Sequence, residues 1–244
     1  MAGNPAENSL RLLCEYEGSA EKITIIPRIE SSLALDQIFI ASFHIDSLEM
    51  ASSARLLLTK EKPFAEFPEK PIIFRVLFWY PRNMGPPAFY TFKAVFFQNA
   101  REDFSLTCRL GFSLPEAEFN GKEYLFSIQK KPFTPKRFLL LTETSESLKR
   151  AITSDRGGNF FLLPEEEKDW ENLLTLCDTY GIAGGLLLKE GEKAEDIPPE
   201  LFHHPSLLFL FSPDLAGGGK EEFHISPLRK VLILPSNILQ NQLL

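Results

Sequence analysis

Three polar residues of the second half of the chain each come after an apolar run. Glu143, Lys189 and Ser212 follow the runs FLLL, LLL and LLFLF, directly or within two residues. If these runs are neighbouring parallel strands, their carboxyl ends meet at one edge of a sheet, where open α/β proteins collect functional groups. A carboxylate, an ammonium and a hydroxyl at this edge could bind a small molecule or serve an enzyme. We call these three residues the predicted edge site.

Other residue types give no further motif. Cys14, Cys108 and Cys177 are odd in number and far apart, without a CxxC pair or a histidine at ligand spacing. They therefore indicate neither a disulfide framework nor a zinc site, and free buried thiols are predicted. His203 and His204 are adjacent and cannot easily chelate one metal ion. No GxSxG or HExxH is present, so we predict no catalytic residue, metal or cofactor.

Composition narrows the class of protein. The chain has 244 residues and a formal net charge of −7, and most of the acidic excess lies after residue 135. No basic face or stripe is visible, which argues against a nucleic-acid partner. No apolar run reaches the roughly 18 residues of a membrane span, and the N-terminus lacks the pattern of a signal peptide. We therefore expect a cytoplasmic protein without a membrane span.

The first half has the pattern of an antiparallel β-domain. Apolar and aromatic segments of strand length alternate with Gly, Pro, Asn or charged clusters over residues 9–131, and none keeps a helical stripe for three turns. The expected strands are SLRLLCEYEG, KITIIPRIE, QIFIASFHI, SARLLLTKE, PIIFRVLFWY, FYTFKAVFFQ, FSLTCRLGFSL and KEYLFSIQ. These segments predict a β-barrel or β-sandwich.

A change of period follows the stretch 132–136, which contains Pro132 and Pro135 and is predicted to be a linker. Residues 137–244 contain five continuous apolar runs. Helical spacing is clear in two places, behind Ser145 and from Trp170 to Gly181. Strands that are apolar throughout occur where helices cover both faces of a sheet. This pattern predicts an α/β domain with a five-stranded parallel sheet of the flavodoxin type.

The second half resembles the receiver domain of bacterial response regulators. Glu143 and Ser212 stand where receivers place an acid after the first strand and Ser or Thr after the fourth. Lys189 stands where receivers have the phosphoacceptor Asp, and Leu234 stands where they have the Lys of a Lys-Pro pair. The resemblance implies a degenerate pseudo-receiver that is used for contacts. An unrelated flavodoxin-like domain would show the same five strands.

The first half resembles PilZ barrels, the bacterial receptors for cyclic-di-GMP. Arg28 lies near the position of their RxxxR segment, and Asp46 can be taken as the acid of their (D/N)xSxxG turn. Leu48 and Ala51 then replace the Ser and the Gly of that turn. The resemblance implies a degenerate PilZ-like barrel with Arg28 and Asp46 as its ligand-binding residues.

These patterns together predict a non-catalytic bacterial signalling or adaptor protein with an α+β, two-domain architecture. It would act through a protein partner, for which the aromatic strands between residues 72 and 97 offer a surface. Two alternatives stay open. The first is a receptor for a cyclic dinucleotide or another small molecule with an altered site, and the second is an enzyme that uses the predicted edge site.

Overall fold

The structure, a computed structural model, describes residues 9–33, 36–45, 50–99, 101–136, 145–154, 158–164, 170–215, 219–226 and 228–241. It forms two compact units. Unit 1 comprises Met1–Val76 and Tyr90–Leu110, and unit 2 comprises Leu77–Phe89 and Gly111–Leu244. The chain therefore enters unit 2 at Leu77, returns to unit 1 at Tyr90, and enters unit 2 again at Gly111.

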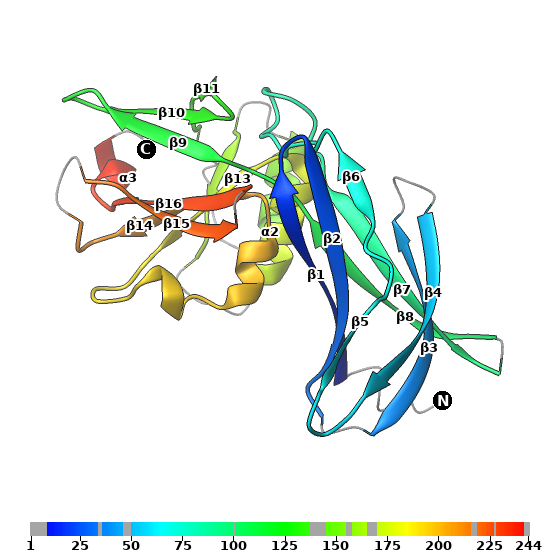
Figure 1. Ribbon diagram of the computed structural model, residues 1–244. Coiled ribbons are helices and arrows are strands. Elements are labelled where there is room, and N and C mark those ends of the chain that lie inside the picture. Colours follow the sequence, from blue (N-terminus) through cyan, green and yellow to red (C-terminus); the bar gives the residue numbers. More distant parts are fainter. Residues whose placement is uncertain are drawn as a thin grey trace. The chain divides into compact units, whose positions relative to one another are not determined.

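Unit 1 consists of two antiparallel sheets (Figure 1). The first contains β1 (Leu10–Ser19), β2 (Lys22–Ser31), β5 (Phe64–Glu66) and β6 (Ile72–Phe74), with β5 and β6 both paired to β2. The second has the order β4-β3-β7-β8, formed by β4 (Met50–Leu58), β3 (Gln37–Ile45), β7 (Tyr90–Gln98) and β8 (Arg101–Leu110).

Alternation along the strands builds the core of unit 1. In β2 every second residue from Ile23 to Ile29 is buried, while the residues that alternate with them are partly exposed. Phe43 of β3 lies across from this sheet, and its ring centroid is 5.3 Å from that of Phe67, which follows β5. The buried faces of the two sheets therefore pack on one another as a β-sandwich.

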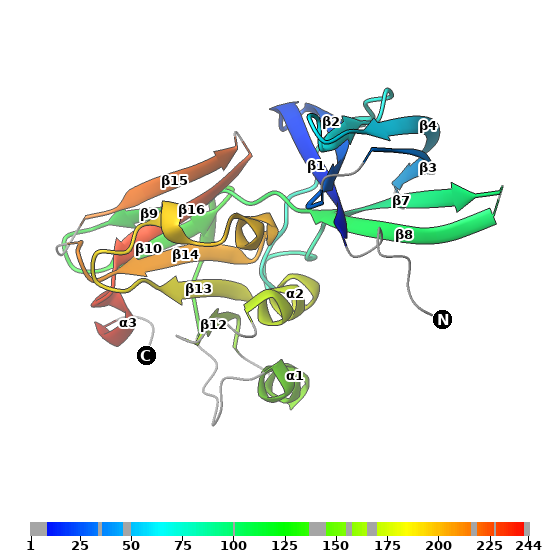
Figure 2. The same ribbon diagram turned by 90° about the horizontal axis from the view of Figure 1, so that it is seen from below.

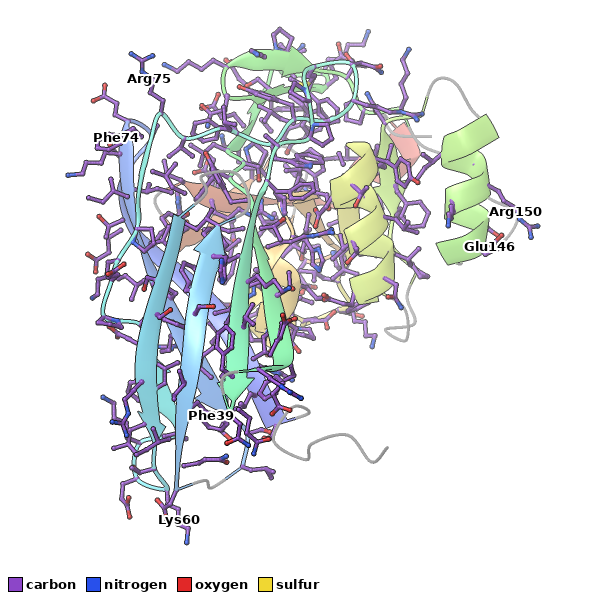
Figure 3. The ribbon with its side chains drawn as sticks, turned by 90° about the vertical axis from the view of Figure 1, so that its right-hand side faces the viewer. Phe39, Lys60, Phe74, Arg75, Glu146 and Arg150 are labelled. Atoms are coloured by element: carbon purple, nitrogen blue, oxygen red, sulfur yellow. The ribbon has the colours of Figure 1, made fainter. Side chains whose placement is uncertain are left out.

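The predicted strands of the first half are confirmed except for one. The pattern of PIIFRVLFWY predicts one strand over residues 71–80, but β6 ends at Phe74, next to Arg75 (Figure 3). Arg75 has a φ of 55°. Positive φ does not continue a strand. The chain enters unit 2 two residues later. The prediction of a PilZ-like barrel is wrong, since the strands form two separate sheets.

Unit 2 contains a three-stranded and a five-stranded sheet. The order β11-β10-β9 is formed by β9 (Pro115–Phe119), β10 (Tyr124–Ile128) and β11 (Lys131–Phe133). The order β12-β13-β14-β16-β15 is formed by β12 (Phe160–Leu162), β13 (Ala183–Leu187), β14 (Leu207–Ser212), β16 (Arg229–Pro235) and β15 (Glu221–Ser226). Its helices are α1 (Ser145–Ser154), α2 (Trp170–Tyr180), α3 (Ile238–Asn241) and the 3₁₀ helices η3 (Ala194–Asp196) and η4 (Pro199–His203).

The five-stranded sheet is buried on both faces (Figure 2). Helices α1, α2 and η4 cover one face, where Leu173, Leu174 and Leu210 are buried together. The three-stranded sheet packs against the other face, and Phe126 and Phe133 meet Phe209 there. Unit 2 therefore has three layers, one of helices and two of β-sheet.

The predicted flavodoxin-like sheet is wrong, although several of its elements are confirmed. Helices α1 and α2 and four of the five predicted strands lie where the sequence predicts them, while the run 138–141 lies outside the described residues. However, β15 runs antiparallel to β16 at the edge of the sheet. In addition, the three-stranded sheet covers much of the second face, together with the short helix α3. An apolar strand shows that both faces are buried, but it does not show what buries them.

The two compact units do not follow the predicted division of the chain. The predicted linker, residues 132–136, begins within β11. Asn159 holds the backbone that follows, because its side chain accepts a hydrogen bond from Lys136 N at 2.6 Å and donates one to Thr134 O at 3.0 Å. Strands β9 to β11 belong to unit 2. Domains over residues 9–131 and 137–244 that fold independently thus stay a prediction. Within the part of the chain that the structure describes, no helix is long and apolar enough to cross a membrane.

Two neighbouring glycines of β13 allow the tight packing of unit 2 to be tested. A Cβ at Gly185 would lie 2.7 Å from Phe211 Cε2 and 2.8 Å from Phe160 Cζ, whereas a Cβ at Gly184 would lie 3.1 Å from the end of the Leu174 side chain. We expect Gly185→Ala to lower the free energy of unfolding by about 1–3 kcal/mol because two rings must move. Gly184→Ala should cost less, because a leucine end can turn away.

Urea unfolding followed by tryptophan fluorescence measures both variants, because Trp79 and Trp170 are both buried in unit 2. Equal losses for the two variants, or no loss for Gly185→Ala, would contradict the described packing.

Candidate functional site

Unit 2 has a cavity of about 960 Å³ between the three-stranded sheet and the β15–β16 edge of the five-stranded sheet. We call it the charged cleft. Its lining residues are Glu116, Ala117, Glu118, Glu123, Tyr124, Leu125, Phe126, Ser127, Pro132, Phe133, Thr134, Pro135, Lys220, Glu222 and Lys230. The volume is within the range of small-molecule sites.

The alternation of β10 and β15 explains why this cleft is apolar on one side and charged on the other. Tyr124 and Phe126 of β10 are buried in the core between the two sheets. In β15, Phe223 and Ile225 pack on the helical side of the sheet. Glu222 alternates with them and therefore lies on the opposite face, toward the three-stranded sheet.

A network of ion pairs lies along the β15–β16 wall of the cleft. Glu222 Oε1 lies 3.1 Å from Lys230 Nζ and 3.6 Å from Lys220 Nζ, and its Oε2 lies 3.3 Å from His224 Nε2. Burial by itself raises the pKa of Glu222. The hydrogen bond and charge of Lys230, with the charges of Lys220 and His224, outweigh it and lower the pKa. Glu222 is therefore ionised at neutral pH.

Further hydrogen bonds fix the walls of the cleft. Lys220 Nζ donates to Ala117 O at 2.8 Å, so this ammonium connects β9 with the start of β15. Tyr124 Oη donates to Gly219 O at 2.7 Å, and burial raises the pKa of this phenol. Ser127 Oγ donates to Glu116 Oε2 at 3.1 Å. Polar groups from three strands thus have defined positions before a ligand arrives.

The arrangement suits a ligand with many hydroxyl groups. Carboxylates accept hydrogen bonds and ammonium groups donate them, and bonds to charged groups are about twice as strong as neutral ones. The lining contains four carboxylates and two ammonium groups, so the cleft carries a net negative charge. Such a site favours neutral or cationic ligands over anions.

Two residues of the predicted edge site lie near one another at the carboxyl edge of β13 and β14. Ser212 is buried at the end of β14, and its Oγ accepts from Asp214 N at 3.2 Å. Lys189 is exposed after β13, and its backbone N donates to Glu192 Oε2 at 2.7 Å. Gly191 N donates to Asp214 Oδ2 at 2.8 Å, which joins the two strand ends. Glu143 lies outside the described residues, so the edge site stays a prediction.

The predicted ligand residue Arg28 lies in unit 1 and contacts carboxylates. Its Nη2 is 2.9 Å from Glu15 Oε1 and 2.7 Å from Glu30 Oε1, and its guanidinium lies over the ring of Phe64. These carboxylates neutralise the positive charge of Arg28, which would be needed to bind a phosphate group. Asp46 lies outside the described residues. The pair Arg28 and Asp46 therefore stays a prediction without support from its surroundings.

The aromatic surface expected between residues 72 and 97 is mostly core. Trp79, Phe92 and Phe96 are buried, while Phe74 is 67% exposed. The dense aromatic run is explained by packing in the two units, because alternate strand positions face the interior.

A second polar cluster of unit 2 is built around His204, which is buried after η4. His204 Nδ1 lies 2.6 Å from Asp178 Oδ2, and Nε2 lies 3.0 Å from Glu171 Oε2, so both ring nitrogens face carboxylates of α2. Burial alone lowers the pKa of His204, but the hydrogen bonds and charges of Asp178 and Glu171 outweigh it and raise the pKa to about 9. The cluster holds the start of β14 on α2, because Ser206 N also donates to Asp178 Oδ1.

Comparison with known proteins identifies the fold. No protein-family model and no curated protein matches the chain. Among solved structures, the chain is similar to a β-glucuronidase of Parabacteroides merdae, with 15% identity and a TM-score of 0.56 over 84% of this chain and 28% of that chain. It is also similar to the exo-chitosanase CsxA of Amycolatopsis orientalis, with 14% identity and a TM-score of 0.57 over 84% and 28%. A β-D-mannosidase from Dictyoglomus thermophilum gives 17% identity and a TM-score of 0.57 over 83% and 29%.

The likeness establishes a fold that the chain shares with parts of glycoside hydrolases, and the chain spans less than a third of the length of these enzymes. The predicted receiver and PilZ resemblances are therefore wrong. The prediction of a non-catalytic signalling or adaptor protein is wrong for the same reason, because the similar structures are enzymes. Both resemblances depended largely on the number and order of the expected strands, which several folds share.

Sequence reasoning missed the charged cleft. One wall comes from residues 116–135 and the other from residues 220–230, which are distant in the sequence. One signal was present, because EEFHIS alternates charged residues with Phe223 and Ile225 as a half-buried strand does. A prediction of β15 beside β16 would have placed Glu222 and Lys230 on one face of the sheet, since these two strands pair with one another.

The His204 cluster predicts a pH-dependent stability of unit 2. The folded-state pKa of about 9 lies above the unfolded value of about 6.5, so the stabilisation is complete below about pH 6.5 and is lost as the pH rises through about 9. We expect a loss on the order of 3 kcal/mol over this window. Urea unfolding at pH 6 and pH 9, followed by tryptophan fluorescence, measures it.

The variant His204→Gln should lose most of this pH dependence, while His224→Gln, at an exposed position of the same unit, should keep it. If wild type and His204→Gln depend on pH equally, the imidazolium is not the stabilising group.

Proposed function

We propose that this chain is a glycosidase-related domain that binds a carbohydrate in the charged cleft. The proposal is carried by one observation, which is the combination of ammonium groups, carboxylates and buried aromatic rings in a preformed cavity of about 960 Å³. Sugars present hydroxyls, which both donate and accept, beside apolar C–H faces. A site with donors, acceptors and an apolar wall complements both.

The shared fold supports this class of ligand. The three similar structures are named a β-glucuronidase, an exo-chitosanase and a β-D-mannosidase, so each is named for a carbohydrate substrate. Both the three-stranded and the five-stranded sheet that border the cleft belong to unit 2. The proposal therefore needs only the geometry of this one unit.

The charges of the cleft select among sugars. Glu116, Glu118 and Glu123 line the cleft from β9 and the residue before β10, and Lys220 and Lys230 line it from the β15–β16 side. Because Glu222 already contacts both lysines, the remaining carboxylates set the preference. An amino sugar places an ammonium group near them, whereas a uronic acid adds a like charge. We therefore expect the order amino sugar, neutral sugar, uronic acid in falling affinity.

Isothermal titration calorimetry of the full chain with oligosaccharides of glucosamine, mannose and glucuronic acid tests this order. The variant Glu116→Gln should weaken the binding of the glucosamine oligosaccharide about tenfold, because a charged hydrogen bond contributes about 1.5–3 kcal/mol. Glu69→Gln, at an exposed position in unit 1, should leave it unchanged. Tightest binding of the glucuronic acid oligosaccharide, or equal effects of the two variants, would contradict the proposal.

A further inference from the structure

Unit 1 brings together two cysteines that are far apart in the sequence. Cys14 lies in β1 and Cys108 lies in β8, and these two strands are neighbours although they belong to different sheets. The two thiols are close enough for each to shift the pKa of the other. The sequence gives no sign of this pair, because its members are separated by most of unit 1.

We propose that Cys14 and Cys108 form a redox pair that closes to a disulfide when a disulfide oxidant reaches it. The bond would connect β1 of one sheet of the sandwich to β8 of the other. A disulfide requires Cα atoms about 4.4–6.8 Å apart. Strands in contact, as β1 and β8 are, can bring two residues within this range. Both cysteines are partly exposed, so a small oxidant has access to them.

The surroundings of the two thiols give them different roles. The hydrogen bond from Cys14 lowers the pKa of Cys108, whereas burial and the neighbouring Cys108 raise the pKa of Cys14. The thiolate is the nucleophile in thiol–disulfide exchange. Cys108 is therefore the attacking residue, and Cys14 is the resolving one.

The exchange balances with a disulfide of small thiols as the oxidant. The Cys108 thiolate attacks one sulfur of the oxidant, the oxidant's S–S bond breaks, and one small thiolate leaves. Cys14 then loses its proton and attacks Cys108 Sγ, which releases the second small thiolate. The two cysteines are oxidised by two electrons in total, and the oxidant is reduced to two thiols that take up the two protons.

Cys177 provides an internal control. It is fully buried in unit 2, and burial, together with the charge of Asp178, raises the pKa of its thiol. A buried thiol of this kind is inert. It should react only after unfolding, which separates exchange at the pair from general oxidation.

The test treats the full chain with excess oxidised glutathione and then alkylates the remaining thiols in denaturant. Mass spectrometry should show the loss of two hydrogens, one alkylated residue at Cys177, and a peptide that joins Cys14 to Cys108. Closing so long a loop should also raise the Tm of unit 1 by about 5 °C or more. A chain that keeps three free thiols, or that joins another pair, overturns the proposal.

Two serine variants test the assigned roles. Cys14→Ser should accumulate a stable glutathione adduct on Cys108, whereas Cys108→Ser should take up glutathione much more slowly at Cys14. Both variants should lose the oxidation-dependent rise in Tm and keep the Tm of the reduced wild type. Equal adduct formation on both variants would show that the two thiols do not differ, and would overturn the assigned order of attack.

Discussion

The packing of β14 between two layers is the interaction on which unit 2 depends. Phe209 lies 5.4 Å from Phe126 and 6.0 Å from Phe160, measured between ring centroids, and it is parallel to Phe133 at 6.4 Å. These rings hold the three-stranded sheet on the five-stranded one. Position 185 accommodates only glycine without rearrangement, because Phe160 and Phe211 occupy the space that a Cβ would need. Removing ring contacts here would separate the layers that form the walls of the charged cleft.

The cleft lies where this apolar contact ends. Toward β15 and β16 the space between the sheets is lined by Glu222, Lys220 and Lys230 instead of by rings. Charges can remain there because each has a partner, and an unpaired charge in a partly buried site would be costly. The same network that makes the open end of the layers stable also provides the donors and acceptors for a ligand. On this account, stability and the proposed carbohydrate binding depend on the same side chains.

The sequence predicts local elements well and their assembly poorly. Most strands of the first half and helices α1 and α2 follow from alternation and helical spacing, which are properties of neighbouring residues. The fold class does not follow, because an apolar strand such as β14 reads the same whether helices or a sheet cover it. The chain leaves unit 1 shortly after Arg75, which has a φ of 55°. No pattern of residue types predicts this backbone conformation. The cleft and the Cys14–Cys108 pair are formed by contacts between distant strands, which periodicity does not contain.

The position of a bound sugar tests the central claim most directly. Crystals of the full chain soaked with a glucosamine oligosaccharide should show the sugar in the charged cleft, within hydrogen-bond distance of the Glu116 carboxylate and the Lys220 ammonium group. A sugar bound elsewhere, for example beside Lys189 and Ser212, would contradict the account. So would a cleft that stays empty when the oligosaccharide is saturating.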